Sequence, residues 1–477
     1  MKLCKLIKFP DHFKVDISCF HAFLLSCLIA LISIMNSNGG ILYEEMYTRL
    51  PYYLSDIPLL QKLFDSQMLD DGLYRARELS YLFDFIDVKF VELCIEHGYP
   101  HFLSLTHYLL CIATGCIIWS FCVKILNLSP LTGIGWLVLF WTSPSVYFSG
   151  YFINRTGKVM VMFLTSIIFY FLCKAVVLAK EENSFPISKI DWFLYSISML
   201  IITFLDEQGV FLCMVFFTLL LIWHLIIRQK EFAIMIFVCL ATIILHGLYR
   251  FFIAPHFIFA LNGYRPDFSY QILPMILYVE NLAQYLQAGF FLYLDTFRFL
   301  IGNPPLPIGF ILLILLIFSP IYFMYANRQR SDNYRKCFGL ALGGFLITNV
   351  LLVIMNSFML LKHPPLMWPE ARRVFYWLPT TVILVMTLSV WTRLFHKSAV
   401  FKFCIVFSIC LAVVGNIVAL PKHKAIIMRQ ESYVHSNIQS SSDLLKALKN
   451  LYALTDSDDP VIEKNPVFQF FKLKKKD

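Results

Sequence analysis

Charged residues are scarce in this chain. Asp, Glu, Lys and Arg make up 15% of its 477 residues, whereas 58% are hydrophobic and 17% are aromatic. A soluble protein of this length would carry considerably more charge. Many apolar runs are long enough to cross the hydrocarbon core as helices, which takes about 20 residues each. The composition therefore excludes a soluble globular protein and predicts an all-α, polytopic membrane protein.

Several short motifs are missing as well. The 13 cysteines form no CxxC pair and no Cys/His ligand spacing, so we expect neither a disulfide framework nor a zinc site. The chain contains no P-loop GKS/T and no GxGxxG, so nothing supports ATP-driven chemistry. The first apolar run lacks a clear small-residue cleavage site, and we interpret it as a retained signal-anchor.

The apolar runs predict about 11 to 12 transmembrane helices. We place them at 18–36, 103–126, 131–151, 158–179, 190–205, 209–227, 231–252, 308–326, 337–360, 374–392 and 399–420. The segment 272–302 is aromatic but interrupted by charges, and it either crosses the membrane or forms amphipathic helices on the outer surface. The spans form one domain, 1–420, followed by a short polar tail, 421–477, with an amphipathic helix.

Basic residues set the orientation. Four lysines precede the first span and place the N-terminus in the cytoplasm. The loop 37–101 then lies outside, and its eleven acidic residues against five basic ones agree with that side. We expect this large first outer loop to carry short amphipathic helices, and the region 253–307 to join it on the outer face. The net charge of +9 fits contact with membrane lipids and does not indicate nucleic acid binding.

The densest group of charged residues lies in the first outer loop, where two carboxylates, two arginines and a glutamate fall within 70–81. If a helix begins at Gly72, the second carboxylate shares a face with Arg75 and Glu78. One interpretation is then an acidic helix start with internal ion pairs. The other is a working site, because Asp70 lies off that face and a free carboxylate beside the bilayer is suited to act as a general base.

Basic groups gather on the same outer side, in two places. One lies at the mouth of a span and the other in a later loop: Arg155 and Lys158, then Lys362, His363, Arg372 and Arg373. Arginine forks match two phosphate oxygens at once, although such cations also simply contact lipid headgroups. Because positive charge on the outer side runs against the usual bias, two separate patches favour a phosphate site.

A second carboxylate pair, Asp206 and Glu207, lies in a tight turn between two predicted spans. This pair either holds a metal, binds sugar hydroxyls or pairs with Arg155, or else it is a solvated turn. The lone histidines in apolar runs, among them His107 and His246, we interpret as packed rather than catalytic.

This layout resembles the GT-C class of integral-membrane glycosyltransferases. In that class an acidic motif in the first outer loop is followed by Tyr and a small or basic residue, and here it reads Asp70-Asp71-Gly72-Leu73-Tyr74-Arg75-Ala76. The stretch Arg372-Arg373-Val374-Phe375-Tyr376-Trp377-Leu378-Pro379 looks like the arginine of the class, followed by an aromatic-apolar span with a proline. The acidic pair lies farther from the first span than is usual in the class, and the C-terminal tail is short. Within the class, chain length and the short tail resemble the serotype-converting O-antigen glycosyltransferases.

The resemblance implies an inverting transferase in a bacterial inner membrane that works on the periplasmic side. It would move a sugar from a polyprenyl-phosphate lipid, such as undecaprenyl phosphate, to a glycan, lipid or protein acceptor, as in lipopolysaccharide decoration. The implied base is Asp70 or Asp71. The donor phosphate would be held by Arg372, Arg373, Lys362, His363, Arg155 and Lys158, and the substrate would contact Asp206, Glu207, Tyr74 and Arg77.

Some members of the class use a divalent cation, and here Mg²⁺ or Mn²⁺ remains open. Two other classes compete with this interpretation: an O-antigen polymerase or ligase, and a non-enzymatic lipid or glycan transporter. Transporters usually place charge near the membrane midplane on broken helices, whereas here charge gathers at the outer ends of spans.

Overall fold

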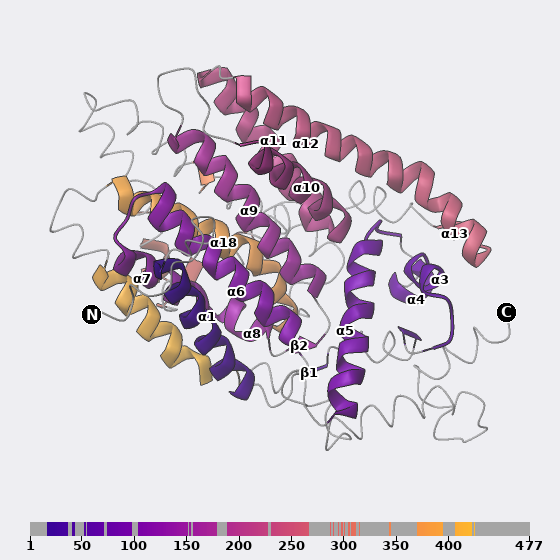
Figure 1. The fold of residues 1–477 in the computed structure, drawn as a ribbon, viewed down its shortest axis with the longest axis horizontal. Helices are drawn as coiled ribbons and strands as arrows, with labels where there is room; N and C mark the ends of the chain where they lie inside the picture. The colour runs from indigo at the N-terminus through magenta and orange to yellow at the C-terminus, as the bar shows by residue number, and fades with distance from the viewer. Residues whose placement is uncertain are drawn as a thin grey trace, which may run out of the picture.

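The structure is a computed structural model, shown in Figure 1. It describes residues 17–36, 41–42, 52–53, 55–70, 74–97, 104–150, 152–153, 156–178, 188–227, 230–266, 370–394 and 406–421, with isolated positions between 287 and 344 and at 424.

Helices make up nearly all of this described part. Those of the bundle are α1 (Ile17–Asn36), α6 (Leu105–Ser120), α7 (Pro130–Thr142), α8 (Pro144–Ser149), α9 (Thr156–Leu178), α10 (Lys189–Leu205), α11 (Glu207–Ile227), α12 (Lys230–Leu248), α13 (Ala254–Asn262), α18 (Glu370–Leu394) and a helix at Val406–Pro421. Two π-helical segments, η4 (Phe121–Ile125) and η5 (Tyr249–Ile253), extend α6 and join α12 to α13. The first outer loop contributes α3 (Leu59–Leu63), α4 (Ser66–Asp70) and α5 (Glu78–Glu96).

The helical membrane architecture predicted from composition is confirmed in the described residues. Four helical stretches there are long and apolar enough to cross a membrane: Leu105–Ile125, Thr156–Ala175, Glu207–Leu225 and Glu231–Asn262. The chain is therefore an integral membrane protein. The predicted spans 308–326 and 337–360, and the C-terminal tail, lie almost entirely outside the described residues.

The helix α9 occupies the centre of the bundle. It packs against α5, α6, α10 and α18, and most of its length is buried. Figure 1 shows these helices side by side, with α12, η5 and α13 forming one long edge. Large aromatic side chains fill the interior, among them Trp119, Trp141 and Phe169. Because α9 begins at Thr156, its first turn brings side chains from the predicted outer side into contact with α5 and α10.

Two predicted spans have different bounds in the structure. The segment 131–151 is split into α7 and α8, because Ser143 is extended and Pro144 starts a new helix. The predicted span 231–252 continues without a break through η5 to Asn262. It ends where Gly263 adopts a positive φ of 76°, which a glycine accepts without steric cost.

The first outer loop also departs from prediction. The prediction of a helix that begins at Gly72 is wrong, because α5 begins only at Glu78. Ala76 has a φ of 51°, and this left-handed conformation is incompatible with an α-helix. The loop's first strand, β1 (Ile41–Leu42), pairs in parallel with β2 (Phe152–Ile153). This pairing ties the start of the outer loop to the segment just before α9.

Candidate functional site

The acidic motif begins at the end of one outer helix and runs into a buried turn. Asp70 is the last residue of α4, while its side chain and all of Asp71 lie outside the described residues. The turn that follows is buried, with Tyr74 and Arg77 each less than 10% exposed. The motif is therefore not a solvated helix start, and its second half faces the protein interior.

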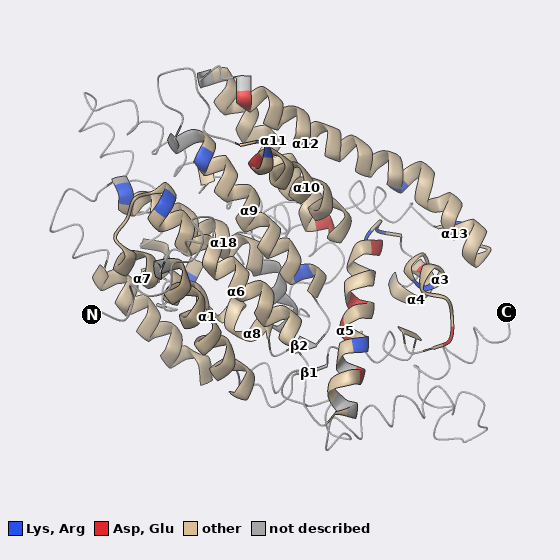
Figure 2. Cartoon of the chain, viewed as in Figure 1, with Lys and Arg blue, Asp and Glu red and all other residues tan. Residues whose placement is uncertain are grey.

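A buried ion pair lies next to this turn. The Nζ atom of Lys158, in the first turn of α9, is 2.6 Å from Oδ2 of Asp206, and an amino nitrogen of Arg77 is 3.8 Å from the same oxygen. All three side chains are almost fully buried. Figure 2 shows long uncharged stretches on the helices of the bundle, whereas α5 carries charged residues along its length. The interpretation of Asp206 as part of a solvated turn is therefore wrong.

Asp206 owes its place to the junction of α10 and α11. Its backbone is extended, and its Oδ1 accepts the N–H of Gln208 at 3.1 Å, so it caps the start of α11. Burial alone would raise the pKa of this carboxyl, but the charges of Lys158 and Arg77 outweigh burial and hold its pKa below the usual range. Asp206 thus stays ionised and acts as the counter-charge for two buried cations.

A second group of polar contacts joins α5 to η5. The Tyr74 hydroxyl donates to Oε1 of Glu78 at 2.6 Å, and the hydroxyl of Tyr249 also bonds to Glu78. Burial, followed by the charge of Glu78, raises the pKa of Tyr74 far above its usual value. Because Arg77 and Glu78 are adjacent, this group is continuous with the ion pair at Asp206.

The cluster contains three polar side chains whose buried atoms have no hydrogen-bond partner within the described residues. These are both ring nitrogens of His246, both amide atoms of Gln208, and two guanidinium nitrogens of Arg250. Gln208 is fully buried and His246 nearly so. Buried polar groups in proteins normally have partners, so three such side chains in one cluster favour a site that takes a polar ligand.

Arg250 stands out among the three. It lies in η5, and short π-helical segments often occur at functional sites because they change the direction of neighbouring side chains. The charges that act on it include Glu207, the largest, with Arg75 and Glu78 as smaller contributions. A cation inside the long apolar stretch 231–262, with acidic neighbours and with two buried guanidinium nitrogens that have no hydrogen bond among the described residues, is suited to bind an anionic ligand.

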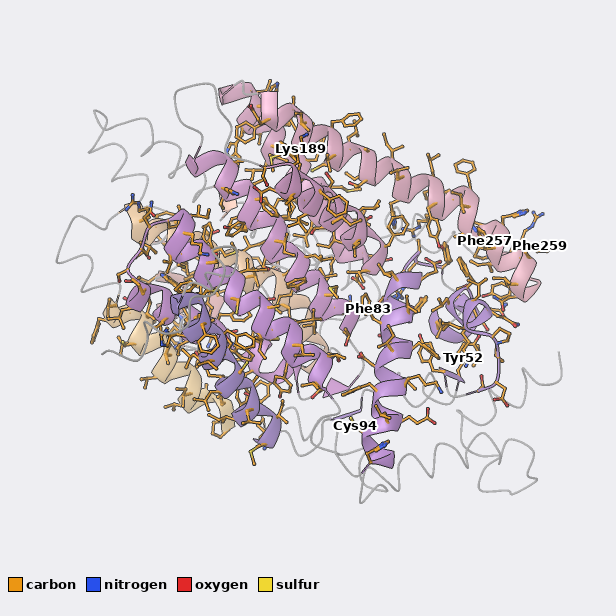
Figure 3. The ribbon with its side chains drawn as sticks, viewed as in Figure 1. Tyr52, Phe83, Cys94, Lys189, Phe257 and Phe259 are labelled. Atoms are coloured by element: carbon orange, nitrogen blue, oxygen red, sulfur yellow. The ribbon has the colours of Figure 1, made fainter. Side chains whose placement is uncertain are left out.

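The short helices α3 and α4 are held against α13 by hydrogen bonds and ring stacking. The hydroxyl of Tyr264, just after α13, donates to Oδ1 of Asp65 at 3.2 Å and accepts the N–H of Gln67 at 3.0 Å. Phe64 stacks on Phe257 with ring centroids 5.4 Å apart, and Phe257 of α13 is labelled in Figure 3. These contacts hold α4, and with it the backbone of Asp70, against α13 on the side of the molecule that carries η5.

The structure brings together five of the residues singled out from the sequence, namely Tyr74, Arg77, Lys158, Asp206 and Glu207. Others cannot be placed: Asp71, Arg155, Lys362 and His363 lie outside the described residues, as do the side chains of Asp70, Arg372 and Arg373. The backbone of the two arginines lies in the first turn of α18, which begins at Glu370, earlier than the predicted span.

Sequence reasoning missed Gln208, His246, Tyr249 and Arg250. The available signal was the i, i+4 spacing of His246 and Arg250 inside a predicted span, since ionisable residues in spans often mark functional sites. For a metal, the described residues contain no group of three or more His, Cys, Asp or Glu side chains arranged to bind one.

Comparisons with known proteins add little. No family model matches this chain, and no curated protein matches it. Among solved structures, it is similar to ArnT from Cupriavidus metallidurans bound to undecaprenyl phosphate. That match covers 83% of this chain and 77% of ArnT, with 11% identity and a TM-score of 0.35. A TM-score this low does not establish a common fold, so function has to be inferred from the residues of this chain.

Proposed function

We propose that this protein is a membrane glycosyltransferase that moves a sugar from a polyprenyl-phosphate donor to a glycan, lipid or protein acceptor on the outer side of the membrane. The observation that carries the proposal is Arg250, two of whose guanidinium nitrogens, Nε and Nη2, are buried without a hydrogen-bond partner in the described part of the chain. A lipid phosphate would reach such a group from the bilayer, and an arginine fork matches its oxygens.

The charge balance of the cluster supports an anionic ligand. Its basic members outnumber its acidic ones, since Arg75, Arg77, Lys158 and Arg250 face Glu78, Asp206 and Glu207. As the polyprenyl phosphate leaves, such preorganised cations stabilise the growing negative charge. Arg372 and Arg373 remain proposed donor-phosphate ligands from the start of α18.

The carboxylates of the cluster are poorly suited to act as the base. Asp206 is held ionised at a low pKa by two cations, and Glu78 already accepts hydrogen bonds from two tyrosines. A general base needs a carboxylate that is free to take the acceptor's proton. Asp70 or Asp71 therefore keeps this proposed role, in which the acceptor oxygen attacks the anomeric carbon on the face opposite the phosphate.

Binding of the bare lipid phosphate tests this proposal. Purified protein in lipid nanodiscs is titrated with undecaprenyl phosphate and, separately, with undecaprenol, which lacks the phosphate. We expect the phosphate to be preferred, and Arg250→Gln to weaken its binding roughly tenfold or more, because a hydrogen bond to a charged group contributes about 1.5–3 kcal/mol.

Arg393→Gln, at the far end of α18 from Arg372 and Arg373, is the matched control and should bind like the wild type. Equal affinity for the two lipids, or no effect of Arg250→Gln, would rule out a polyprenyl-phosphate site at Arg250.

A further inference from the structure

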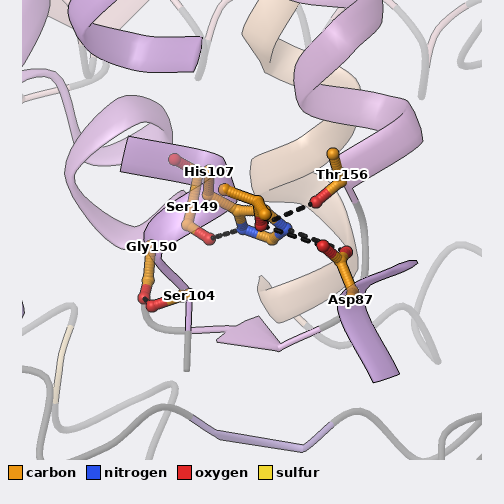
Figure 4. A network of polar contacts seen from close by, with 7 residues as sticks. Asp87, Ser104, His107, Ser149, Gly150 and Thr156 are labelled. Atoms are coloured by element: carbon orange, nitrogen blue, oxygen red, sulfur yellow. Dashed lines mark hydrogen bonds and ion pairs between the residues drawn. The ribbon is translucent and has the colours of Figure 1, made fainter. Parts of the chain in front are cut away.

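A separate buried polar network lies where α5, α6, α8 and α9 meet (Figure 4). Asp87 comes from the middle of α5 and His107 from the first turn of α6, and both are almost fully buried. The His107 Nε2 and Asp87 Oδ2 atoms are 4.0 Å apart. The Thr106 hydroxyl donates to Oδ1 of Asp87 at 2.9 Å and lies 3.0 Å from the hydroxyl of Thr156.

The hydrogen bonds of His107 restrict where its proton lies. Nδ1 is 2.8 Å from the carbonyl oxygen of Ser149, and a carbonyl can only accept, so Nδ1 carries a hydrogen. Nε2 is then the atom that faces Asp87. If Asp87 were ionised and His107 neutral, two lone pairs would face each other in a site closed to water. One additional proton, on either Nε2 or Oδ2, removes this repulsion.

In the part of the chain that the structure describes, few other titratable groups lie near this pair. On α5, Asp84 lies one turn before Asp87 and is buried; on α6, Cys111 lies one turn after His107 and contacts the Ser149 hydroxyl. On α9, Lys158 is committed to Asp206. Burial raises the pKa of Asp87 to about 6, and it outweighs the hydrogen bonds from Thr156 and Thr106, which lower this pKa.

The network ends at the first residue of α9. Both the backbone N–H and the hydroxyl of Thr156 bond to Asp87, so a carboxyl from the outer loop anchors the start of the central helix. The next residue, Gly157, lies so close to Ser80 of α5 that a Cβ there would overlap its side chain. Lys158 follows in the same turn and reaches Asp206.

We propose that Asp87 and His107 share one proton in the folded protein, and that this proton fixes the first turn of α9 and thereby the position of Lys158. Asp87 and His107 are positioning residues, because they act on the candidate site through Thr156. When the proton leaves for solvent at higher pH, the two facing groups repel each other and the first turn of α9 loosens. Only the effect on ligand binding through Lys158 rests on the proposed function. The shared proton and its effect on the first turn of α9 are independent of that function.

The sign of the pH effect follows from the raised pKa of Asp87. An acid whose folded-state pKa lies above its unfolded value gives a stabilisation that is complete below the unfolded pKa, about 4, and is lost as pH rises through the folded pKa, about 6. Asp87→Asn imitates the protonated carboxyl, since an amide can accept from Thr156 and donate to Nε2. It should therefore remove this pH dependence.

Hydrogen exchange of the wild-type protein tests the proposal without any variant. Between pH 5 and 7.5, after correction for the chemical exchange rate, we expect segment 156–160 to lose protection while the start of α10, segment 189–193, does not. The unfolding temperature should fall by about 2–5 °C over the same range. Equal behaviour of the two segments would overturn the proposal.

Two variants complete the test. In Asp87→Asn both pH effects should be absent, and its stability at pH 5 should match the wild type. Asp191→Asn removes the charge pair between Lys174, near the C-terminal end of α9, and Asp191, in the first turn of α10. This variant should keep the wild-type pH profile. If Asp87→Asn kept that profile too, the shared proton would be ruled out. None of these measurements needs a substrate, so their failure is distinct from failure of the proposed function.

Discussion

At the scale of single residues, two ion pairs on α9 offer a natural comparison. Lys158–Asp206 and Lys174–Asp191 have nearly the same separation, 2.6 and 2.7 Å. They differ in burial, because the side chains of the first pair are about 5% exposed and those of the second nearly 20% exposed. Removing one partner from a buried pair leaves an uncompensated charge in a medium that solvates it poorly, whereas a pair in contact with solvent contributes little.

Asp206→Asn should therefore lower the free energy of unfolding by about 3–5 kcal/mol, because Lys158 and Arg77 both lose their counter-charge. Asp191→Asn should cost about 1 kcal/mol or less. Unfolding of both variants in detergent, followed by tryptophan fluorescence, checks the difference. Equal stability of the two variants would contradict a buried ion pair at Asp206.

Arg250 shows what sequence reasoning could not reach at this scale. Its charge is visible in the sequence, but it stands at the end of an apolar run and looks like an ordinary interfacial arginine. Only the structure shows that η5 places it near Glu207 and Glu78, residues from two other elements. Lys158 and Asp206, by contrast, are recognisable from the sequence, because both lie at the predicted outer ends of spans.

At the scale of elements, the hairpin of α10 and α11 depends on Gly209. A Cβ at this position would overlap the backbone carbonyl of Ile202, in the preceding helix. Backbone cannot move aside as a flexible side chain does. The close approach of the two helices is what leaves Asp206 buried between them.

Gly209→Ala should thus destabilise the protein by about 1–3 kcal/mol through overpacking, and it should weaken ligand binding by displacing Asp206. Gly247→Ala is the matched control, because a Cβ there meets no atom within 4 Å and alanine favours a helix. Thermal unfolding of the two variants tests this account. A Gly209→Ala protein as stable as Gly247→Ala would contradict it.

The start of α5 shows why local patterns misplace an element. The charge spacing of Asp71, Arg75 and Glu78 fits a helix, and the prediction followed that spacing. In the structure, Ala76 turns out of the helical region and packs with Tyr74 against Ala254 and Ile258 of α13. Contacts with a helix some 180 residues later determine this turn, and no local pattern records them.

At the scale of the whole molecule, the stretch from α12 to α13 is longer than the bilayer requires. Its 32 residues would extend about 48 Å, against a hydrocarbon core of about 30 Å. Exposed apolar side chains continue along it, from Phe237 through Phe251 and Phe252 to Phe259. This continuity fits a helix that is tilted in the bilayer and whose apolar side chains stay in contact with lipid as far as α13.

A photo-reactive amino acid in place of Phe252 should therefore form adducts with lipid in nanodiscs. The same residue in place of Gln67, which is exposed on α4 in the outer loop, should form few. Mass spectrometry of the cross-linked protein measures both yields. Similar yields at the two positions would contradict contact between η5 and lipid.

Composition alone was sufficient to predict the helical membrane architecture, because so few charged side chains cannot cover the water-exposed surface of a soluble protein of this length. Apolar runs also located every span that the structure describes, to within a few residues in most cases. They did not reveal that α9 is the central helix, since burial inside protein and burial in lipid demand the same apolar residues. The contact between Lys158 and Asp206 depends on how α9 packs against α10, which only the structure shows.

Sugar transfer is the measurement that tests the central claim most directly. Wild-type protein in nanodiscs is given a panel of undecaprenyl-phosphate hexoses with lipopolysaccharide as the acceptor, and release of undecaprenyl phosphate is followed. We expect release with at least one donor, unchanged in Asp191→Asn and reduced about 10²- to 10⁴-fold in the Asp70→Asn/Asp71→Asn double variant, as loss of a general base predicts. Full activity in that double variant would contradict the account.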